Sequence, residues 1–308
     1  MILCKSIENY MEELTMNNYK NKNEYLINLD NLYKFNKELF YEKVNELKFY
    51  DAILFDCCEF EKIFNYLLDK YKDKIDINLQ KKYNNTLLHL LIEQKQYDLF
   101  KKVLLIYKDK YNINLQDNNG RTILHYLIKQ EQYDLFKEVL LMYKDEYNMH
   151  LKNNYGYTIL NYLVFKRQYD LFKEVLLLFK DKVDINLQND NGNTILHYLL
   201  CEKQYDLFKE VLLMYKDKYD INLKNKNGDT ILHWLNYGKQ FDLFKEVLLM
   251  YKDEYNINLQ NDDGNTILHL LIRYKKYDLF REVFKMFENK MNDDLYSFCV
   301  KNIKELKL

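Results

Sequence analysis

Six histidines carry the side chains of this sequence whose chemistry would matter most if they came together, because imidazole binds metal ions and transfers protons. Five of them recur at a 36-residue step or twice that step: His89, His125, His197, His233 and His269. A shared metal ion needs ring nitrogens about 2.0–2.1 Å away, whereas equivalent positions on stacked helices lie about 8–10 Å apart. We therefore expect no metal site and a structural role for these histidines. His150 lies outside the pattern, and we expect it to be exposed.

Nothing else in the sequence favours catalysis. The only serines are Ser6 and Ser297, there is no glycine-rich phosphate loop, and no cysteine stands at a meaningful spacing from a histidine. The adjacent Cys57 and Cys58 have no second pair, so we interpret them as small buried residues rather than zinc ligands. The sequence predicts a protein that is not an enzyme and has no cofactor.

The elements that must position these residues form an internal repeat. A threonine recurs every 36 residues, and a Leu-Phe pair keeps the same step from Leu99-Phe100 to Leu279-Phe280. A fixed period of this length is typical of a solenoid. The six threonines, which number repeats one to six here, are Thr86, Thr122, Thr158, Thr194, Thr230 and Thr266.

Repeat four shows the structure that we expect of each repeat. Turn-forming residues at 190–193 precede Thr194, which can cap a short apolar helix from Ile195 to about Glu202. A second helix from about Tyr205 to Lys216 has its apolar residues on one face. Residues 220–223 are predicted to run back as a strand to the next turn.

The repeats give the chain a predicted order of segments. Terminal repeats of a solenoid are usually atypical because one of their faces meets water. Apolar residues at helical spacing also lie outside the repeats, at Ile7–Met16, Leu32–Leu47 and Asp293–Leu306. We expect an N-terminal helical cap at residues 1–49, a degenerate repeat at 50–83, six clear repeats at 84–290 and a C-terminal capping helix at 291–308.

The motif Gly-x-Thr-x-Leu-His, followed by two helices and Asp/Asn-Ile-Asn, resembles the ankyrin repeat. It stands, for example, as Gly120–His125, Gly192–His197 and Gly264–His269. The resemblance implies an all-α solenoid of stacked helix-turn-helix repeats with short β-turn or hairpin connections and helical caps. The chain departs from the family in having Ile or Leu after the threonine instead of Pro, and in a period three residues longer.

In the ankyrin family, the repeated threonine and histidine join a hydrogen-bond network between repeats, and the resemblance implies the same here. Asn161 replaces the histidine in repeat three and keeps a hydrogen-bonding group. The expected network comprises Thr86, His89, Thr122, His125, Thr158, Asn161, Thr194, His197, Thr230, His233, Thr266 and His269.

A row of aromatic residues is the main indication of a binding surface. Tyr126, Tyr162, Tyr198 and Trp234 each follow the histidine position, which the resemblance places beside the concave face that ankyrin proteins use for partners. These side chains either anchor a protein interface or fill gaps in the longer repeats. Binding should also use turn tips and inner-helix ends, where repeats differ most: Arg121, Tyr155, Tyr157, Asn193, Asp229 and Asn265, with Lys129, Phe165, Lys166, Glu202, Tyr237 and Arg273.

Composition and charge limit the compartment and the partner. The net charge of -1 disfavours nucleic acid, and no apolar run approaches the roughly 18 residues that span a bilayer. Five scattered cysteines and the absence of a signal-like start favour a soluble cytoplasmic protein. The abundance of Lys, Asn, Ile and Tyr suggests a low-GC genome.

The favoured interpretation is a non-enzymatic scaffold that binds another, unknown protein through its concave face and turn tips. We expect a monomer that binds neither nucleic acid nor a membrane. One alternative is a microbial or viral effector that docks a host factor, with delivery into a host cell left open. The other is a structural or self-associating solenoid.

Overall fold

A computed structural model describes residues 54–55 and 61–306 of the 308-residue chain. The predicted N-terminal cap at residues 1–49 and the Cys57-Cys58 pair lie outside the described residues. The chain divides into two compact units, an N-terminal unit that ends at Tyr147 and a C-terminal unit that begins at Asn148.

The described part of the N-terminal unit contains two complete helix pairs and one preceding helix. Its helices are α5 (Glu61–Tyr71), α6 (Leu87–Glu93), α7 (Tyr97–Ile106), α8 (Ile123–Lys129) and α9 (Tyr133–Met142), with a 3₁₀ turn at Lys82–Asn84. The inner helices α6 and α8 pack against each other, and each also packs against the outer helix that follows it.

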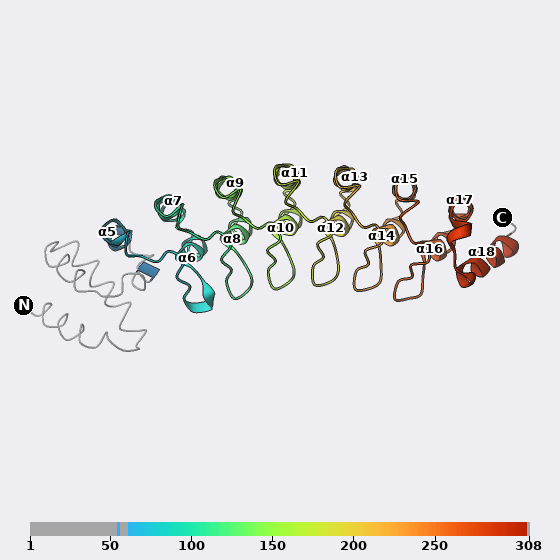
Figure 1. Ribbon diagram of the computed structural model, residues 1–308, viewed down its shortest axis with the longest axis horizontal. Helices are drawn as coiled ribbons and strands as arrows, with labels where there is room; N and C mark the ends of the chain where they lie inside the picture. The colour runs from blue at the N-terminus through green and yellow to red at the C-terminus, as the bar shows by residue number, and fades with distance from the viewer. Residues whose placement is uncertain (1–53, 56–60, 307–308) are drawn as a thin grey trace, which may run out of the picture. The chain divides into compact units, whose positions relative to one another are not determined.

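The C-terminal unit repeats this arrangement four times. Its helices are α10 (Ile159–Phe165), α11 (Tyr169–Leu178), α12 (Ile195–Cys201), α13 (Tyr205–Met214), α14 (Ile231–Tyr237), α15 (Phe241–Met250), α16 (Ile267–Arg273), α17 (Tyr277–Phe287) and α18 (Asp293–Glu305), with a 3₁₀ turn at Glu288–Lys290. Within this unit the inner helices α10, α12, α14 and α16 form one row and the outer helices α11, α13, α15 and α17 a second (Figure 1). The predicted all-α stack of two-helix repeats is confirmed.

Local sequence explains where the helices begin and end. Thr194 has an extended backbone and exchanges hydrogen bonds with His197 three residues later, which caps α12. The outer helix α13 buries Phe208, Val211 and Leu212 on one face. These side chains recur at helical spacing and form the core between the two layers.

A tight turn joins each inner helix to its outer helix. Lys203 has a φ of 57°, and its amide donates to the Leu200 carbonyl at 3.1 Å. The Gln204 amide donates to the Leu199 carbonyl at 2.8 Å. These two hydrogen bonds terminate the inner helix, and Lys203 adopts the left-handed backbone conformation at a position where glycine is the usual residue.

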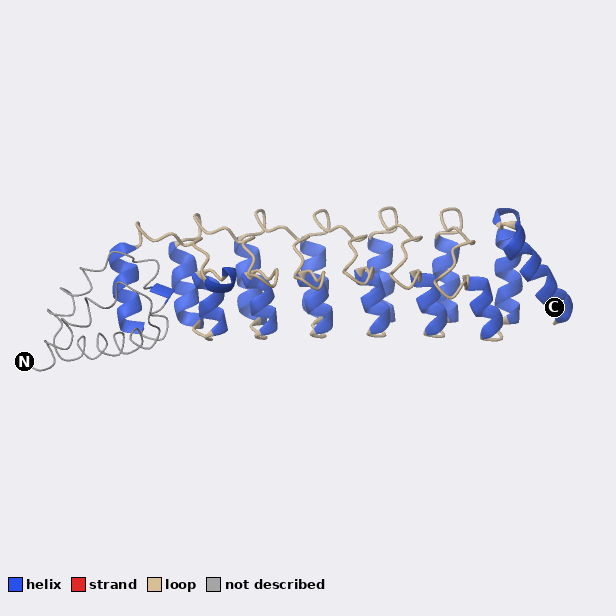
Figure 2. Cartoon of the chain, turned by 90° about the horizontal axis from the view of Figure 1, so that it is seen from below, coloured by secondary structure: helices blue, strands red, loops and turns tan. Residues whose placement is uncertain are grey.

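The predicted return strand is wrong. No strand occurs among the described residues, and residues 220–223 form a turn in which the Leu223 amide donates to the Asp220 carbonyl at 3.3 Å. Neighbouring loops instead share a single backbone bond, such as Lys226 N–H to the Asn191 carbonyl at 2.9 Å, too few for a ladder. The loops between repeats therefore project as separate fingers from the inner helices of the C-terminal unit (Figure 1), and Figure 2 shows them as loops rather than strands.

An asparagine in this turn takes the place of strand pairing. The side-chain amide nitrogen of Asn222 donates to the Glu254 carbonyl at 2.9 Å. The side-chain oxygen of Asn222 accepts from the Asn256 backbone amide at 2.8 Å. Asn186 makes the same two contacts with Lys218 and Asp220. One side chain thus joins two consecutive repeats.

We expect Asn222→Ala to lower the free energy of unfolding by about 1–3 kcal/mol, because two hydrogen bonds between repeats are lost. Urea unfolding followed by circular dichroism measures the loss. Asn227→Ala is the matched control, since Asn227 is an exposed residue of the neighbouring finger and surface substitutions usually stay within about 0.5 kcal/mol. Equal midpoints for the two variants would contradict a joining role for Asn222.

Candidate protein-interaction surface

Except for the half-buried His269, the repeated threonine–histidine pairs are buried. Thr194 and His197 are fully buried, with the threonine hydroxyl 2.9 Å from Nδ1 of the ring. On the far side of the ring, His89 Nε2 lies 3.1 Å from the Arg121 carbonyl and His233 Nε2 lies 3.1 Å from the Asn265 carbonyl. In repeats one and five the ring therefore caps its own helix and contacts the finger of the next repeat.

Burial favours the neutral form of these rings. Burial lowers the pKa of His89 and of His197 to about 4, and it also lowers the pKa of His233 and of His269. A neutral ring has one nitrogen that accepts and one that donates, which matches a threonine cap on one side and a carbonyl on the other.

Repeat three has different residues at two positions around its threonine, the histidine position and the position of a tyrosine that lies near the threonine hydroxyl in other repeats. Asn161 accepts from the Thr158 amide at 3.0 Å and from its hydroxyl at 2.9 Å, so the cap survives. Val183 stands where other repeats have a tyrosine, such as Tyr111, whose hydroxyl is 3.3 Å from Thr86. The smaller side chains leave a cavity of about 20 Å³, room for one water molecule, lined by Met149, His150, Thr158, Leu160, Asn161, Val183, Asp184, Leu187 and Ile195.

The four aromatic residues that follow the histidine position differ in exposure. Tyr126, in the N-terminal unit, is 4% exposed and donates to the Asp117 carboxylate at 2.9 Å. In the C-terminal unit Tyr162, Tyr198 and Trp234 are half-buried. Tyr126 therefore bonds within its own repeat and packs edge-on against His89 of the preceding repeat. The other three residues are partly exposed to solvent.

Each half-buried tyrosine also holds its own finger. The Asn153 amide donates to the Tyr162 hydroxyl at 3.0 Å, and the Asn189 amide donates to the Tyr198 hydroxyl at 2.5 Å. Trp234 departs from this pattern, because its ring packs edge-on against His197 at 5.7 Å and its Nε1 is buried without a hydrogen-bond partner. The rings thus combine an exposed edge with a structural contact.

The finger residues just before the threonine serve mostly as contacts between repeats. Asn193 accepts from the Asn225 amide at 3.1 Å. Asp229 is buried and accepts from the Tyr237 hydroxyl at 2.8 Å and the Asn261 amide at 3.0 Å. Arg121 and Asn265 are half-buried and supply the carbonyls beside His89 and His233.

Tyr157 is the exception at this position, because it builds an aromatic cluster. Its ring centre lies 6.3 Å from that of Tyr162, 5.7 Å from Tyr198 and 6.4 Å from Tyr155. Tyr155 is 63% exposed, and Phe165 at the end of the same inner helix is 69% exposed. Among the described fingers and inner helices of the C-terminal unit, the aromatic side chains with the highest exposed fractions are therefore those of repeat three.

The last residue of each inner helix is exposed and differs between repeats. In the C-terminal unit these residues are Phe165, Cys201, Tyr237 and Arg273, and in the N-terminal unit they include Lys129. We call the following set of the C-terminal unit the inner-helix surface: Tyr155, Tyr157, Tyr162, Phe165, Tyr198, Cys201, Trp234, Tyr237 and Arg273. It combines aromatic edges with one cation.

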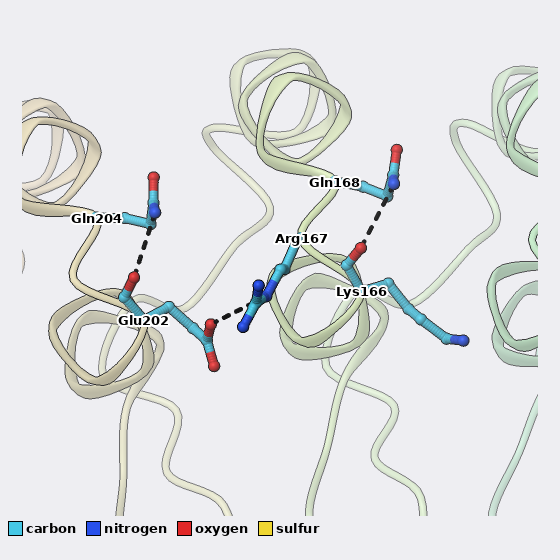
Figure 3. Close-up of polar contacts among 5 residues, drawn as sticks. All are labelled: Lys166, Arg167, Gln168, Glu202 and Gln204. Carbon is cyan, nitrogen blue, oxygen red and sulfur yellow. Dashed lines mark hydrogen bonds and ion pairs between the residues drawn. The ribbon is translucent and has the colours of Figure 1, made fainter.

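Charged residues directly follow the exposed ends of α10 and α12 in the sequence, and Figure 3 shows their polar contacts. Arg167 Nε lies 3.6 Å from a Glu202 carboxylate oxygen, which links repeats three and four. Gln168 and Gln204 donate to the carbonyls of Lys166 and Glu202 at 3.4 and 3.2 Å. The Lys166 side chain points away from the Arg167–Glu202 pair in Figure 3.

His150 is exposed, as expected, but it has a role that the sequence did not suggest. It stands 36 residues before Asn186 and, like the joining asparagines, accepts a backbone amide of the next repeat, that of Asp184 at 3.1 Å. Its position in the 36-residue step was the signal that could have revealed this contact.

The described residues hold no group of three or more His, Cys, Asp or Glu side chains that could bind a metal ion. Every helix among residues 54–55 and 61–306 is too short or too polar to span a lipid bilayer.

The fold and this surface define a helical repeat protein. A family model described as "Ankyrin repeats (3 copies)" matches residues 54–148 and 102–186, and its threonine–histidine motif continues through repeats four to six. Residues 54–186 thus match ankyrin repeats, and the chain has the fold of an ankyrin repeat domain.

A solved ankyrin repeat domain has the same fold. The ankyrin repeat domain of Bcl-3, a member of the IkappaB protein family, is 16% identical, with a TM-score of 0.53 over 74% of this chain and 97% of that chain. A chain in the complex of the predatory endopeptidase Bd0816 from Bdellovibrio bacteriovorus with immunity protein Bd3460 is 24% identical, with a TM-score of 0.46 over 69% of this chain and 100% of that chain. No curated protein sequence matches the chain.

Proposed function

We propose that this chain is a non-enzymatic scaffold that binds another protein through the inner-helix surface. Ankyrin repeats are protein–protein interaction modules, which supports a protein partner. One chain carries all residues of this surface, so a single copy is enough for binding. Near-neutral net charge supports a partner other than nucleic acid or a membrane, and we place the protein in the cytoplasm.

One observation carries the proposal. At the last position of the inner helices the repeats have a phenylalanine, a cysteine, a tyrosine and an arginine, all exposed. One turn earlier lie Tyr162, Tyr198 and Trp234 with their partly exposed rings. Aromatic residues and arginine are the types enriched at the energetic centres of protein interfaces, and the fold itself does not require them at the exposed positions.

The test begins with affinity capture on the full chain and identification of a partner by mass spectrometry. We expect the double variant Tyr155→Ser/Phe165→Ser to raise the dissociation constant for that partner by at least tenfold, because losing a central aromatic contact costs more than about 1 kcal/mol. Isothermal titration calorimetry gives the constant. Both side chains are exposed, so helicity should stay unchanged.

Tyr296→Ser is the matched control. Tyr296 is an exposed aromatic residue of α18, outside the inner-helix surface. We expect it to leave the affinity unchanged. If the double variant binds as tightly as the native protein, the inner-helix surface is not the binding site.

A further inference from the structure

The outer helices of the C-terminal unit present an apolar row to solvent. Leu177, Leu213 and Leu249 occupy the same position of α11, α13 and α15 and are 53%, 51% and 46% exposed. We call these three residues the outer leucine stripe. In the N-terminal unit, Leu105 and Leu141 occupy this position and are also exposed.

Core packing does not explain these leucines. In α13 the core side is formed by Phe208, Val211 and Leu212. Leu213 is one residue beyond Leu212 and is therefore turned by about 100° to the solvent side. A polar residue would suit that position, as Lys285 does at the same place on α17. Aligned exposed leucines of this kind indicate an interaction surface.

Ion pairs between neighbouring outer helices run beside the stripe. Lys209 contacts the Glu246 carboxylate at 2.7 Å, and the pairs Lys173–Glu210 and Lys245–Glu282 repeat the contact. Each of these lysines lies one helical turn before a stripe leucine. The row holds three positive and three negative charges in alternation, so it favours neither an acidic nor a basic partner.

We propose that two copies of this chain pair through the outer leucine stripe, back to back and antiparallel. A partner that covers all three leucines must offer apolar groups at the spacing of the repeats and alternating charges beside them. The same face of a second copy meets both requirements, and a two-fold axis lets each copy contribute the same residues. This dimer differs from the monomer expected from sequence, and it leaves the inner-helix surface of both copies uncovered.

Sedimentation equilibrium on the full chain tests the proposal from about 1 to 200 µM. We expect the mass to rise from 38.0 kDa towards twice that value. Each substitution occurs twice in the dimer, so Leu213→Gln should raise the dissociation constant roughly 10- to 100-fold. The triple variant Leu177→Gln/Leu213→Gln/Leu249→Gln should remain monomeric throughout, whereas Leu213→Met, which keeps an apolar side chain, should still dimerise.

Phe165→Gln is the control, because Phe165 is a more exposed apolar residue on the inner-helix surface. It should dimerise like the native chain, and circular dichroism should show native helicity in every variant. A native chain that stays at 38.0 kDa up to about 200 µM overturns the proposal, as does a triple variant that dimerises normally. Loss of dimerisation in Phe165→Gln alone would place the contact on the inner-helix surface instead and also overturn it.

Discussion

Lowering the pH from 8 to 4.5 will destabilise the fold by roughly 2–3 kcal/mol for each of the two buried histidines His89 and His197. Burial holds the pKa of His197 at about 4, below its usual value of 6.5. Between these values the unfolded chain binds the proton and the folded chain does not. Stability from the neutral ring is therefore complete above about pH 6.5 and is lost as the pH falls towards 4.

His197→Asn isolates this effect, because repeat three already uses Asn161 to cap its inner helix. At pH 8 we expect the free energy of unfolding of the variant to be about 1 kcal/mol lower than that of the native chain, because packing and bonding change. On going from pH 8 to pH 4.5, the variant should lose about 2–3 kcal/mol less of its stability than the native chain does. Urea unfolding at a series of pH values gives both quantities.

Tyr198→Phe is the control for this series. Tyr198 lies on the same inner helix as His197, and the substitution removes a hydroxyl that accepts from the Asn189 side chain of the finger. Any loss of stability should therefore be the same at pH 8 and pH 4.5. If His197→Asn retains the full acid sensitivity of the native chain, then the buried imidazole is not its source.

Gly192→Ala should be among the most damaging single substitutions in the fingers, and Gly264→Ala provides its matched comparison. Both glycines have a left-handed backbone, with φ of +74° and +77°. A Cβ at Gly192 would lie 2.8 Å from the Asn225 Cα and from the Lys226 amide, whereas a Cβ at Gly264 would meet nothing within 4 Å.

The two variants therefore separate backbone conformation from close approach. Gly264→Ala should cost about 1–2 kcal/mol, the strain of a left-handed alanine. Gly192→Ala adds a clash with backbone, which cannot rotate away as a side chain can, and should cost about 1–3 kcal/mol more. Urea midpoints followed by circular dichroism give the difference. Equal losses in the two variants would show that the neighbouring finger yields without cost.

Much of the fold could be predicted because its signals are local. Thr194, Ile195 and His197 fix the start of α12 through contacts three residues apart, and the apolar spacing of α13 selects its buried face. The helix predicted at the C-terminus is present as α18. The prediction of a return strand was wrong because Ile221, a residue with high β-strand propensity, has no partner strand. Asn222 supplies the hydrogen bonds between repeats instead.

The candidate site could be predicted only in part. Tyr126 and Tyr162 occupy the same repeat position, yet Tyr126 is buried against Asp117 while Tyr162 keeps an exposed edge. Asp229 was expected at a binding tip and lies buried under Tyr237. Whether any of these residues contacts a partner stays a prediction.

The sequence by itself determined the 36-residue repeat, the capped inner helices and the apolar face of each outer helix, because each depends on residues within one helical turn or one period. Only the tertiary structure decided which of the similar side chains meet solvent. Tyr126 and Tyr198 stand at the same position of their repeats, and the first is buried while the second is half-buried. The difference arises from packing between helices, since exposure depends on neighbours that the local pattern does not contain.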